Sequence, residues 1–178
     1  MNLDIKLILG GKKRELVYPI DLDPATGMFD EYLPEDVKLI SVRGEIIVTD
    51  RGEYIVVEIS PRVEYELPCS RCLTPVKDEF EFSFERIIPS GGARFAVEDE
   101  LCDEEDILTV TEGHVDVTDH ICEEIALEIP DYVLCSDDCP GLCSKCGKPL
   151  ADGDCGCEKK KEIDPRMEIF KKLLEEDE

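Results

Sequence analysis

The sequence predicts an α+β fold, in which a mainly antiparallel β-sheet or a small barrel is joined by a few helices and a cysteine-rich C-terminal appendage. Apolar and polar residues alternate through the first half of the 178-residue chain, and such alternation places apolar side chains on one face of a strand. One later segment has helical spacing, and six of the ten cysteines then follow within residues 135–157. We therefore expect a β-rich domain at 1–130, a cysteine-rich metal-binding segment at 131–160 and a C-terminal helix at 161–178.

The strands are expected where the alternation is strict, with the turn signal Asp50-Arg51-Gly52 between two of them. The clearest alternation interleaves Phe80, Phe82 and Phe84 with glutamates and a serine. Period two places these three rings on one face and the carboxylates on the other. The expected strands occupy residues 3–9, 40–48, 55–59, 63–67 and 79–85.

Residues 90–106 interrupt this pattern, because Ser90-Gly91-Gly92 indicates a loop and an acidic stretch follows it. We interpret the acidic stretch as a solvated connection. The alternative is that its negative charge attracts a basic partner. A helix is then expected at about 118–129, where Thr118 or Asp119 can cap the start and Pro130 ends it. Its apolar side consists of Ile121, Cys122, Ile125 and Ile129.

The C-terminal helix is expected to open at Asp164-Pro165, an N-cap followed by proline at the first helical position. Met167, Phe170 and Leu174 would then form an apolar stripe along it. This stripe can pack on the chain's own sheet or bind a partner, and the sequence leaves both possibilities open.

The charge of the chain is strongly acidic, with 44 acidic and 20 basic residues and a net charge of −24. Such a field repels phosphate backbones, so broad contact with nucleic acid is disfavoured and a basic protein partner is expected. Solubility alone, or adaptation to heat or salt, is the alternative. The basic runs at 12–14 and 159–161 could still touch RNA locally. No targeting signal or membrane-length apolar run is visible, so we expect a cytoplasmic location.

In a reducing compartment, ten cysteines favour metal or redox chemistry over a disulfide framework. Six of them form three close pairs, and the segment LCSKCG is a zinc-knuckle signature in which Gly147 permits a positive φ. Zinc accepts four thiolates in a tetrahedron, and a metal can supply on the order of 10 kcal/mol to a segment too polar to fold by burial. Iron also suits four thiolates, and disulfides after oxidation are the other alternative. The three pairs are Cys135 and Cys139, Cys143 and Cys146, and Cys155 and Cys157.

A fourth pair, Cys69 and Cys72, lies far upstream in LPCSRCLTPV, between two expected strands. The pair can be half of a metal site, a redox dithiol or two incidental thiols, and its hairpin flanks favour half of a metal site. From pairing alone, we expect two sites that leave no open coordination position and are therefore structural. One would use Cys143, Cys146, Cys155 and Cys157, and the other Cys69, Cys72, Cys135 and Cys139.

Two cysteines are left over, and the sequence offers little catalytic chemistry. Cys122 is expected in the core, whereas Cys102 lies in the acidic stretch and receives no role. The phosphate-binding, nucleophile-elbow and zinc-protease motifs are absent. The two histidines, His114 and His120, give no acid and base pair by spacing. We therefore expect no enzymatic activity.

Together these residues resemble the YceD family of large ribosomal RNA subunit accumulation proteins, most clearly from about residue 37. The matching pieces are CSRCL after a strand, the helix DHICEEIALEIP, the segment CSDDCPGLCSKCGKPL with its trailing CGC, and the ending IDPRMEIFKKLL. The resemblance implies a role in the synthesis, processing or stability of large-subunit (23S) ribosomal RNA, and brings no catalytic residues with it.

We accordingly expect a non-enzymatic accessory factor, an acidic zinc-stapled adaptor for a basic ribosomal or rRNA-processing protein. Two alternatives stay open. The chain could bind RNA directly through its zinc knuckle, or it could be a redox or metal-handling protein that uses Cys69 and Cys72.

Overall fold

The structure is a computed structural model that describes residues 1–89, 107–153 and 155–157. The acidic stretch with Cys102, the lysine run at 159–161 and the expected C-terminal helix lie outside the described residues. Within the described part, no helix has the length and apolar content needed to cross a membrane.

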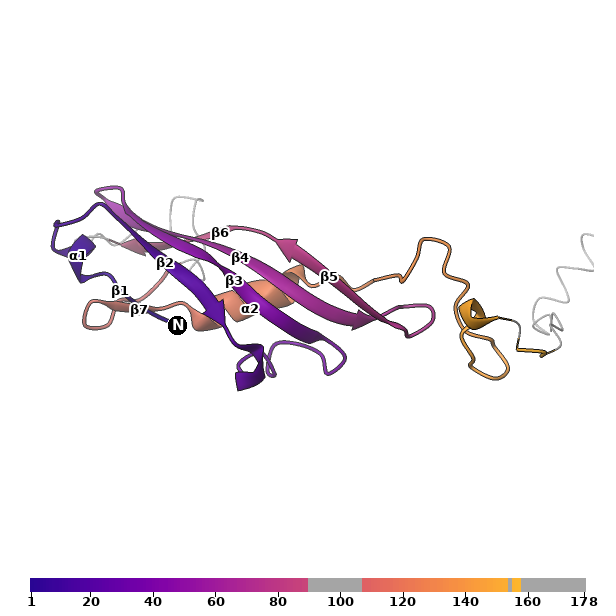
Figure 1. Ribbon diagram of the computed structural model, residues 1–178. Coiled ribbons are helices and arrows are strands. Elements are labelled where there is room, and N and C mark those ends of the chain that lie inside the picture. The colour runs from indigo at the N-terminus through magenta and orange to yellow at the C-terminus, as the bar shows by residue number, and fades with distance from the viewer. Residues whose placement is uncertain (90–106, 154, 158–178) are drawn as a thin grey trace, which may run out of the picture.

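The main element is an antiparallel sheet in the order β2-β3-β4-β5, with β6 also paired to β4. Both β5 and β6 use the same edge of β4, which pairs with β6 through 54–59 and with β5 through 62–68. Because β2 lies at one edge and β5 and β6 lie at the other (Figure 1), the described strands close no barrel. The antiparallel α+β prediction is confirmed, and its small-barrel alternative is wrong. The strands are β2 (Glu15–Leu22), β3 (Lys38–Asp50), β4 (Tyr54–Pro68), β5 (Pro75–Glu81) and β6 (Phe84–Pro89).

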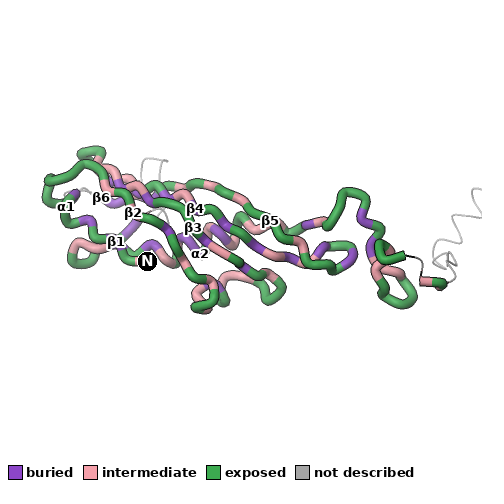
Figure 2. The backbone as a smooth tube through the Cα atoms, in the orientation of Figure 1, coloured by how far each residue is buried: buried purple, intermediate pink, exposed green. Residues whose placement is uncertain are grey.

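Strand β4 is the centre of the core. Its alternate residues from Ile55 to Leu67 are buried, while Glu58 and Glu64 on the opposite face are exposed, and Figure 2 shows this alternation along the strands. The alternation keeps its phase through Pro61, so the two runs expected at 55–59 and 63–67 form one continuous strand.

The run expected at 79–85 is instead divided between β5 and β6. The division at Phe82 and Ser83 faces Pro61 of β4, which has no N–H to donate to a neighbouring strand. Phe82 N donates to the Pro61 carbonyl at 3.3 Å and keeps the two strands in line. The rings of Phe80, Phe82 and Phe84 still stack in series, with centroids 5.8 and 5.9 Å apart, as alternation predicts.

Helix α2 (Thr118–Glu128) packs against β4 through buried Ile121, Cys122 and Ile125. Neither Thr118 nor Asp119 caps it; the N-cap is Val117. Instead, the Asp116 carboxylate accepts hydrogen bonds from the N–H and hydroxyl of Thr118, at 3.0 and 2.6 Å. These bonds occupy donors at the helix start, so no cap within the helix is needed.

The N-terminal run expected as one strand is divided between β1 (Asn2–Asp4), which pairs with β7 (His114–Asp116), and the short helix α1 (Lys6–Leu9). Ile5 and Ile8, three residues apart, are buried here, whereas Leu7 and Leu9 are exposed. That expectation is therefore wrong, because helical spacing determines burial after Ile5. Two short 3₁₀ turns complete the described elements, at Pro24–Thr26 (η1) and Leu150–Asp152 (η3).

Buried residues form two separate clusters. The larger one lies between the sheet, α2 and the β1–β7 pair. The smaller one consists of Cys69, Cys72 and Cys139, with Val76, Leu134 and Leu142 against it. The tip of the β4–β5 hairpin and the cysteine-rich segment lie together at one end of the molecule, opposite α1 (Figure 1).

Candidate metal centres

The first cysteine pair lies in the turn that joins β4 to β5. Cys69 N donates to the Thr74 carbonyl at 2.8 Å, and Leu73 N donates to the Cys69 carbonyl at 2.9 Å. These two bonds close a tight turn that places the sulfur atoms of Cys69 and Cys72 on the same side. The pairing of Pro68 with Pro75 continues the ladder to the base of this turn.

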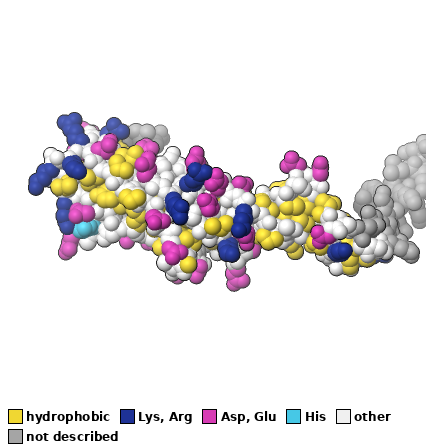
Figure 3. Space-filling model, viewed as in Figure 1, with side chains coloured by type: hydrophobic (Ala, Val, Ile, Leu, Met, Phe, Trp, Pro, Cys, Tyr) yellow, Lys and Arg dark blue, Asp and Glu magenta, His cyan; other side chains and the backbone are white. Residues whose placement is uncertain are grey.

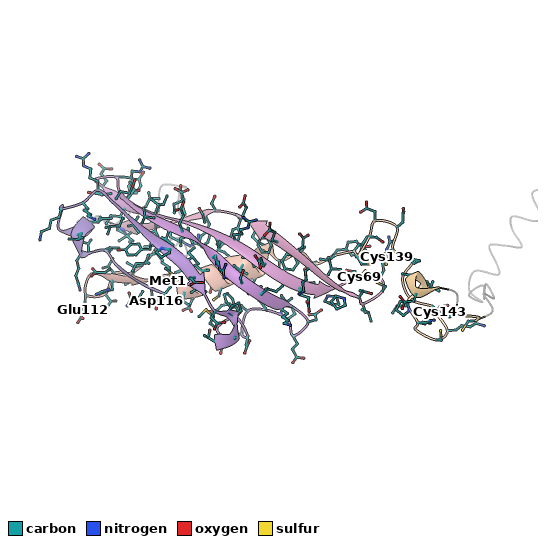
Figure 4. All side chains as sticks on the ribbon, in the orientation of Figure 1. Met1, Cys69, Glu112, Asp116, Cys139 and Cys143 are labelled. Carbon is teal, nitrogen blue, oxygen red and sulfur yellow. The ribbon has the colours of Figure 1, made fainter. Side chains whose placement is uncertain are left out.

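The segment after α2 lies against the hairpin tip. Ser70 N donates to the Val133 carbonyl at 2.8 Å, and Val133 N donates in return to the Ser70 hydroxyl at 3.1 Å. Cys135 N also donates to the Cys69 sulfur at 3.4 Å. This exchange brings Cys135 and Cys139 to the hairpin tip, and Figure 4 shows Cys139 beside Cys69.

The four thiols gathered there, which we call the hairpin-tip group, have the dimensions of a metal centre. The sulfur of Cys72 lies 3.5 Å from that of Cys135, and the sulfur of Cys69 lies 3.8 Å from that of Cys139. Four thiolates at the usual zinc–sulfur distance would lie about 3.8 Å apart in a tetrahedron. A disulfide needs about 2 Å, so these cysteines are free thiols. The hairpin-tip group is Cys69, Cys72, Cys135 and Cys139.

The second set, which we call the distal group, comes entirely from the cysteine-rich segment. Gly147 N donates to the Cys143 carbonyl at 2.8 Å, and Cys143 N donates to the Lys148 carbonyl at 2.9 Å. An isolated bridge between Leu142 and Pro149 closes the base of this turn. Within each group, all four sulfur atoms lie within 4.8 Å of one another, so each group can hold one metal ion. The distal group is Cys143, Cys146, Cys155 and Cys157.

The two turns have the same backbone hydrogen bonds and nearly the same sequence, CSRCL in one and CSKCG in the other. The fifth residue has a positive φ in both turns, +62° at Leu73 and +71° at Gly147. Glycine adopts this conformation freely, whereas a residue with a Cβ is disfavoured by about 1–2 kcal/mol. Leu73 is therefore strained, and its side chain is also 64% exposed.

Arg71 is a second link between the hairpin tip and the segment after α2. Its guanidinium donates to the Cys139 carbonyl at 3.1 Å and to the Tyr132 hydroxyl at 3.2 Å. A Cβ at Gly141 would lie 3.3 Å from the Arg71 carbonyl, so the chain passes close to the turn there. These contacts fix the direction in which the chain leaves the first group toward the distal group.

Hydrogen bonds divide the thiols of each group by acidity. Burial acts against ionisation of Cys69, but N–H groups of Arg71, Cys135 and Cys72 lower its pKa to about 6. Peptide N–H groups of Cys146 and Lys145 likewise lower the pKa of Cys143 to about 6. The first cysteine of each turn is thus held ready as a thiolate, the form that binds metal.

One later thiol in each group holds its proton more tightly. Hydrogen bonding to Cys72 raises the pKa of Cys135 to about 12. Hydrogen bonding to Cys155 likewise raises the pKa of Cys157 to about 12. A cation at the centre of either group would supply the positive charge that four adjacent thiolates require.

Sequence reasoning did not identify Ser70, Arg71, Leu73 and Tyr132 as part of this site. The repeat of CSRCL in CSKCG was a usable signal for Leu73, because glycine occupies the matching position. Ser70, Arg71 and Tyr132 contribute through contacts between segments more than 60 residues apart in the chain, and no local pattern indicates such contacts. Cys122 lies in the core, as expected.

The comparisons with known proteins found a matching family model and several uncharacterized relatives. The family model for large ribosomal RNA subunit accumulation protein YceD matches residues 57–174. The uncharacterized protein YlbN of Bacillus subtilis is 33% identical over 118 residues, which cover 64% of this chain and 63% of YlbN. The uncharacterized protein Rv2926c of Mycobacterium tuberculosis is 33% identical over 106 residues, which cover 60% of this chain.

The same 106 residues span only 49% of the mycobacterial protein. No solved structure matches the chain. The matched residues 57–174 include most of strand β4, helix α2 and all eight cysteines of the two groups. The chain belongs to the YceD family of large ribosomal RNA subunit accumulation proteins.

Proposed function

We propose that this protein is a non-enzymatic accessory factor for large-subunit (23S) ribosomal RNA, built as an acidic adaptor that contains two structural zinc ions. The single observation that supports the role in rRNA metabolism is the family match over residues 57–174. The process follows from the family, and the proposed mode of action follows from the charge and the cysteine groups of this chain.

Zinc is the metal that suits both groups best. It accepts four thiolates in a tetrahedron, and the sulfur separations in the hairpin-tip group are those of such a tetrahedron. Four protein ligands leave no position for a bound water, so a metal in either group would act in folding rather than in hydrolysis. Three of the four hairpin-tip thiols are buried, which also disfavours the redox alternative for Cys69 and Cys72.

The hairpin-tip ion would work as a staple. It would join the β4–β5 turn to residues 135–139, which follow 66 residues after Cys69 in the chain. The distal ion would organise residues 143–157 by themselves. Together the two ions would hold a polar appendage in one orientation on the sheet domain, which is what an adaptor needs for a defined partner.

The partner we propose is a basic protein of the large ribosomal subunit or of its assembly. The net charge of −24 favours such a partner over the rRNA itself. Glu58 of β4 and Glu85 of β6 are directly opposed, whereas Glu79 of β5, which lies opposite Glu64, is already paired with Arg62. Opposed carboxylates disfavour a sheet, so a cationic partner would relieve repulsion that the folded chain contains.

The role in rRNA metabolism is tested by depleting the protein from its own cells and measuring the ratio of 23S to 16S rRNA. Depletion should lower that ratio, and the wild-type chain should restore it. A C69S/C72S chain, which lacks half of the hairpin-tip group, should fail to restore it, whereas the control C122S should succeed. An unchanged ratio after full depletion would refute the role.

The adaptor mechanism is tested with immobilised zinc-loaded chain and the proteins of the large ribosomal subunit, extracted free of rRNA. We expect one or a few basic proteins to bind at low salt and to be released as the salt concentration rises. Binding of 23S rRNA with no protein retained would instead favour the direct RNA-binding alternative.

A further inference from the structure

The turn of the hairpin-tip group contains a leucine that its metal-binding geometry does not require. Gly147 occupies the matching position of the distal turn, and a Cβ built there would have no heavy atom within 4 Å. The same turn therefore forms without a side chain. At Leu73 the chain instead has a branched residue at a φ of +62°, a conformation that glycine would adopt without strain.

Within the described part of the chain, burial of the Leu73 side chain does not offset this backbone strain. It is 64% exposed, although the neighbouring hydrophobic cluster includes Val76, Leu134 and Leu142. Strained residues that are not needed for folding concentrate at binding sites. The observation therefore indicates that the side chain is used for contact with another molecule.

Leu73 lies at the rim of a hollow of about 180 Å³ between the hairpin tip and the segment that follows α2. Leu67, Pro68, Pro130 and Val133 contribute apolar lining. In the view of Figure 3, hydrophobic side chains gather where the hairpin tip meets the cysteine-rich segment. The hollow is large enough to accept one or two side chains, and Leu73 extends its apolar surface.

The charge around the hollow indicates what occupies it. Asp36 and Asp131 also line it, and Arg71, two residues before Leu73 in the turn, is engaged with Tyr132 and Cys139. A phosphate backbone would meet carboxylates here, whereas a lysine or arginine beside an apolar side chain would find both complementary charge and an apolar surface.

We propose that Leu73 and this hollow form the docking site for a segment of the basic protein partner, which inserts an apolar side chain flanked by lysine or arginine. The inference rests on the proposed function and specifies the surface that the partner contacts. A zinc ion in the hairpin-tip group would hold this surface in shape, because the turn and the segment at 130–133 that line the hollow both adjoin its ligands.

Leu73→Gly tests this proposal because it removes the side chain and relieves the backbone strain together. The probe is the most strongly retained basic protein from the rRNA-free large-subunit extract, purified and titrated against the zinc-loaded full chain. We expect L73G to bind it at least about tenfold more weakly. The thermal midpoint should stay equal or rise, and two equivalents of zinc should remain bound. The matched control is Leu9→Ala, an exposed leucine at the opposite end of the molecule, which should bind like the wild type.

The outcomes separate this proposal from the proposed function. If the wild type binds the basic protein and L73G binds it equally well, the adaptor role stands and the docking site is wrong. If L73G lowers the thermal midpoint, Leu73 covers a surface of its own chain. If L73G converts a dimer to a monomer, a second copy of this chain occupies the hollow. Either result overturns the proposal. Loss of rRNA binding alone would overturn it as well, and a wild-type chain that retains no protein would remove both inferences.

Discussion

Cys122 has an environment opposite to that of the clustered cysteines. It is fully buried on the inner face of α2. Burial, together with the charge of Asp119, raises the pKa of its thiol to about 11. At neutral pH this thiol is protonated, and the thiolate is the reactive form. The fold thus contains a buried, protonated thiol that belongs to neither of the two cysteine groups.

We therefore predict that Cys122 resists alkylation by iodoacetamide in the native, zinc-loaded protein at neutral pH. Peptide mass spectrometry should find it unmodified after native treatment and fully modified when the same reagent is added in denaturant. In protein stripped of zinc but not denatured, the clustered cysteines, of which Cys135 and Cys146 are exposed, should react before Cys122. Rapid modification of Cys122 in the native protein would contradict both its burial and its raised pKa.

Helix α2 is joined to the sheet by an ion pair as well as by apolar packing. Glu124 accepts a hydrogen bond from Arg86 of β6, whose guanidinium also lies over the Phe84 ring at 4.9 Å. The side chains of Arg86 and Glu124 are only 10% and 22% exposed. Charges at this depth interact more strongly than those on an open surface. The pair therefore helps to fix where α2 lies across the sheet.

Replacing Glu124 with alanine should lower the free energy of unfolding by about 2 kcal/mol, because a buried charge-assisted hydrogen bond is lost. The neighbouring Glu123 is exposed, so Glu123→Ala is the matched control and should change stability by less than about 0.5 kcal/mol. Urea unfolding followed by circular dichroism measures both. Equal effects of the two substitutions would show that the Arg86 contact contributes nothing.

Elements were predictable where local pattern and tertiary context agree. The alternation in β4 and the helical spacing in α2 each match a face that is buried. The apolar pattern from Leu3 to Leu9 is compatible with both a strand and a helix. Its structure depends on β7, more than 100 residues later, which pairs only with Asn2–Asp4. The division between β5 and β6 faces a proline on the neighbouring strand, so their own sequence does not reveal it.

The candidate site was likewise predictable where the information is local in the sequence, and not where it depends on contacts between distant segments. The spacing within each cysteine pair is local information, and pairing alone grouped the eight cysteines as the structure gathers their sulfur atoms. The contacts that bring the hairpin-tip group together, from Ser70 to Val133 and from Arg71 to Cys139, cross about 65 residues of chain. They could not be read from sequence. Metal binding itself remains a prediction.

At the scale of the whole molecule, the two hydrophobic clusters indicate two sources of stability. The sheet and α2 share a large apolar core that contains none of the eight clustered cysteines. The smaller cluster of buried residues has three cysteines of the hairpin-tip group and few apolar neighbours. The cysteines of the distal group are more exposed still. Removal of metal should therefore act on the appendage, and much less on the sheet.

We predict that purified protein contains two equivalents of zinc, and that C72S and C146S each contain one. After chelation, limited proteolysis should cut between residues 131 and 157, while the fragment that contains the sheet persists and its β-sheet circular dichroism changes little. C146S should expose only residues 140–157 to protease, because the hairpin-tip group is intact. C72S should expose the chain from about residue 131, since the turn no longer holds that segment. If metal-free protein resists cleavage as well as the zinc-loaded form, then thiol–metal bonds do not order the appendage, and neither the staple nor the docking surface beside it would depend on zinc.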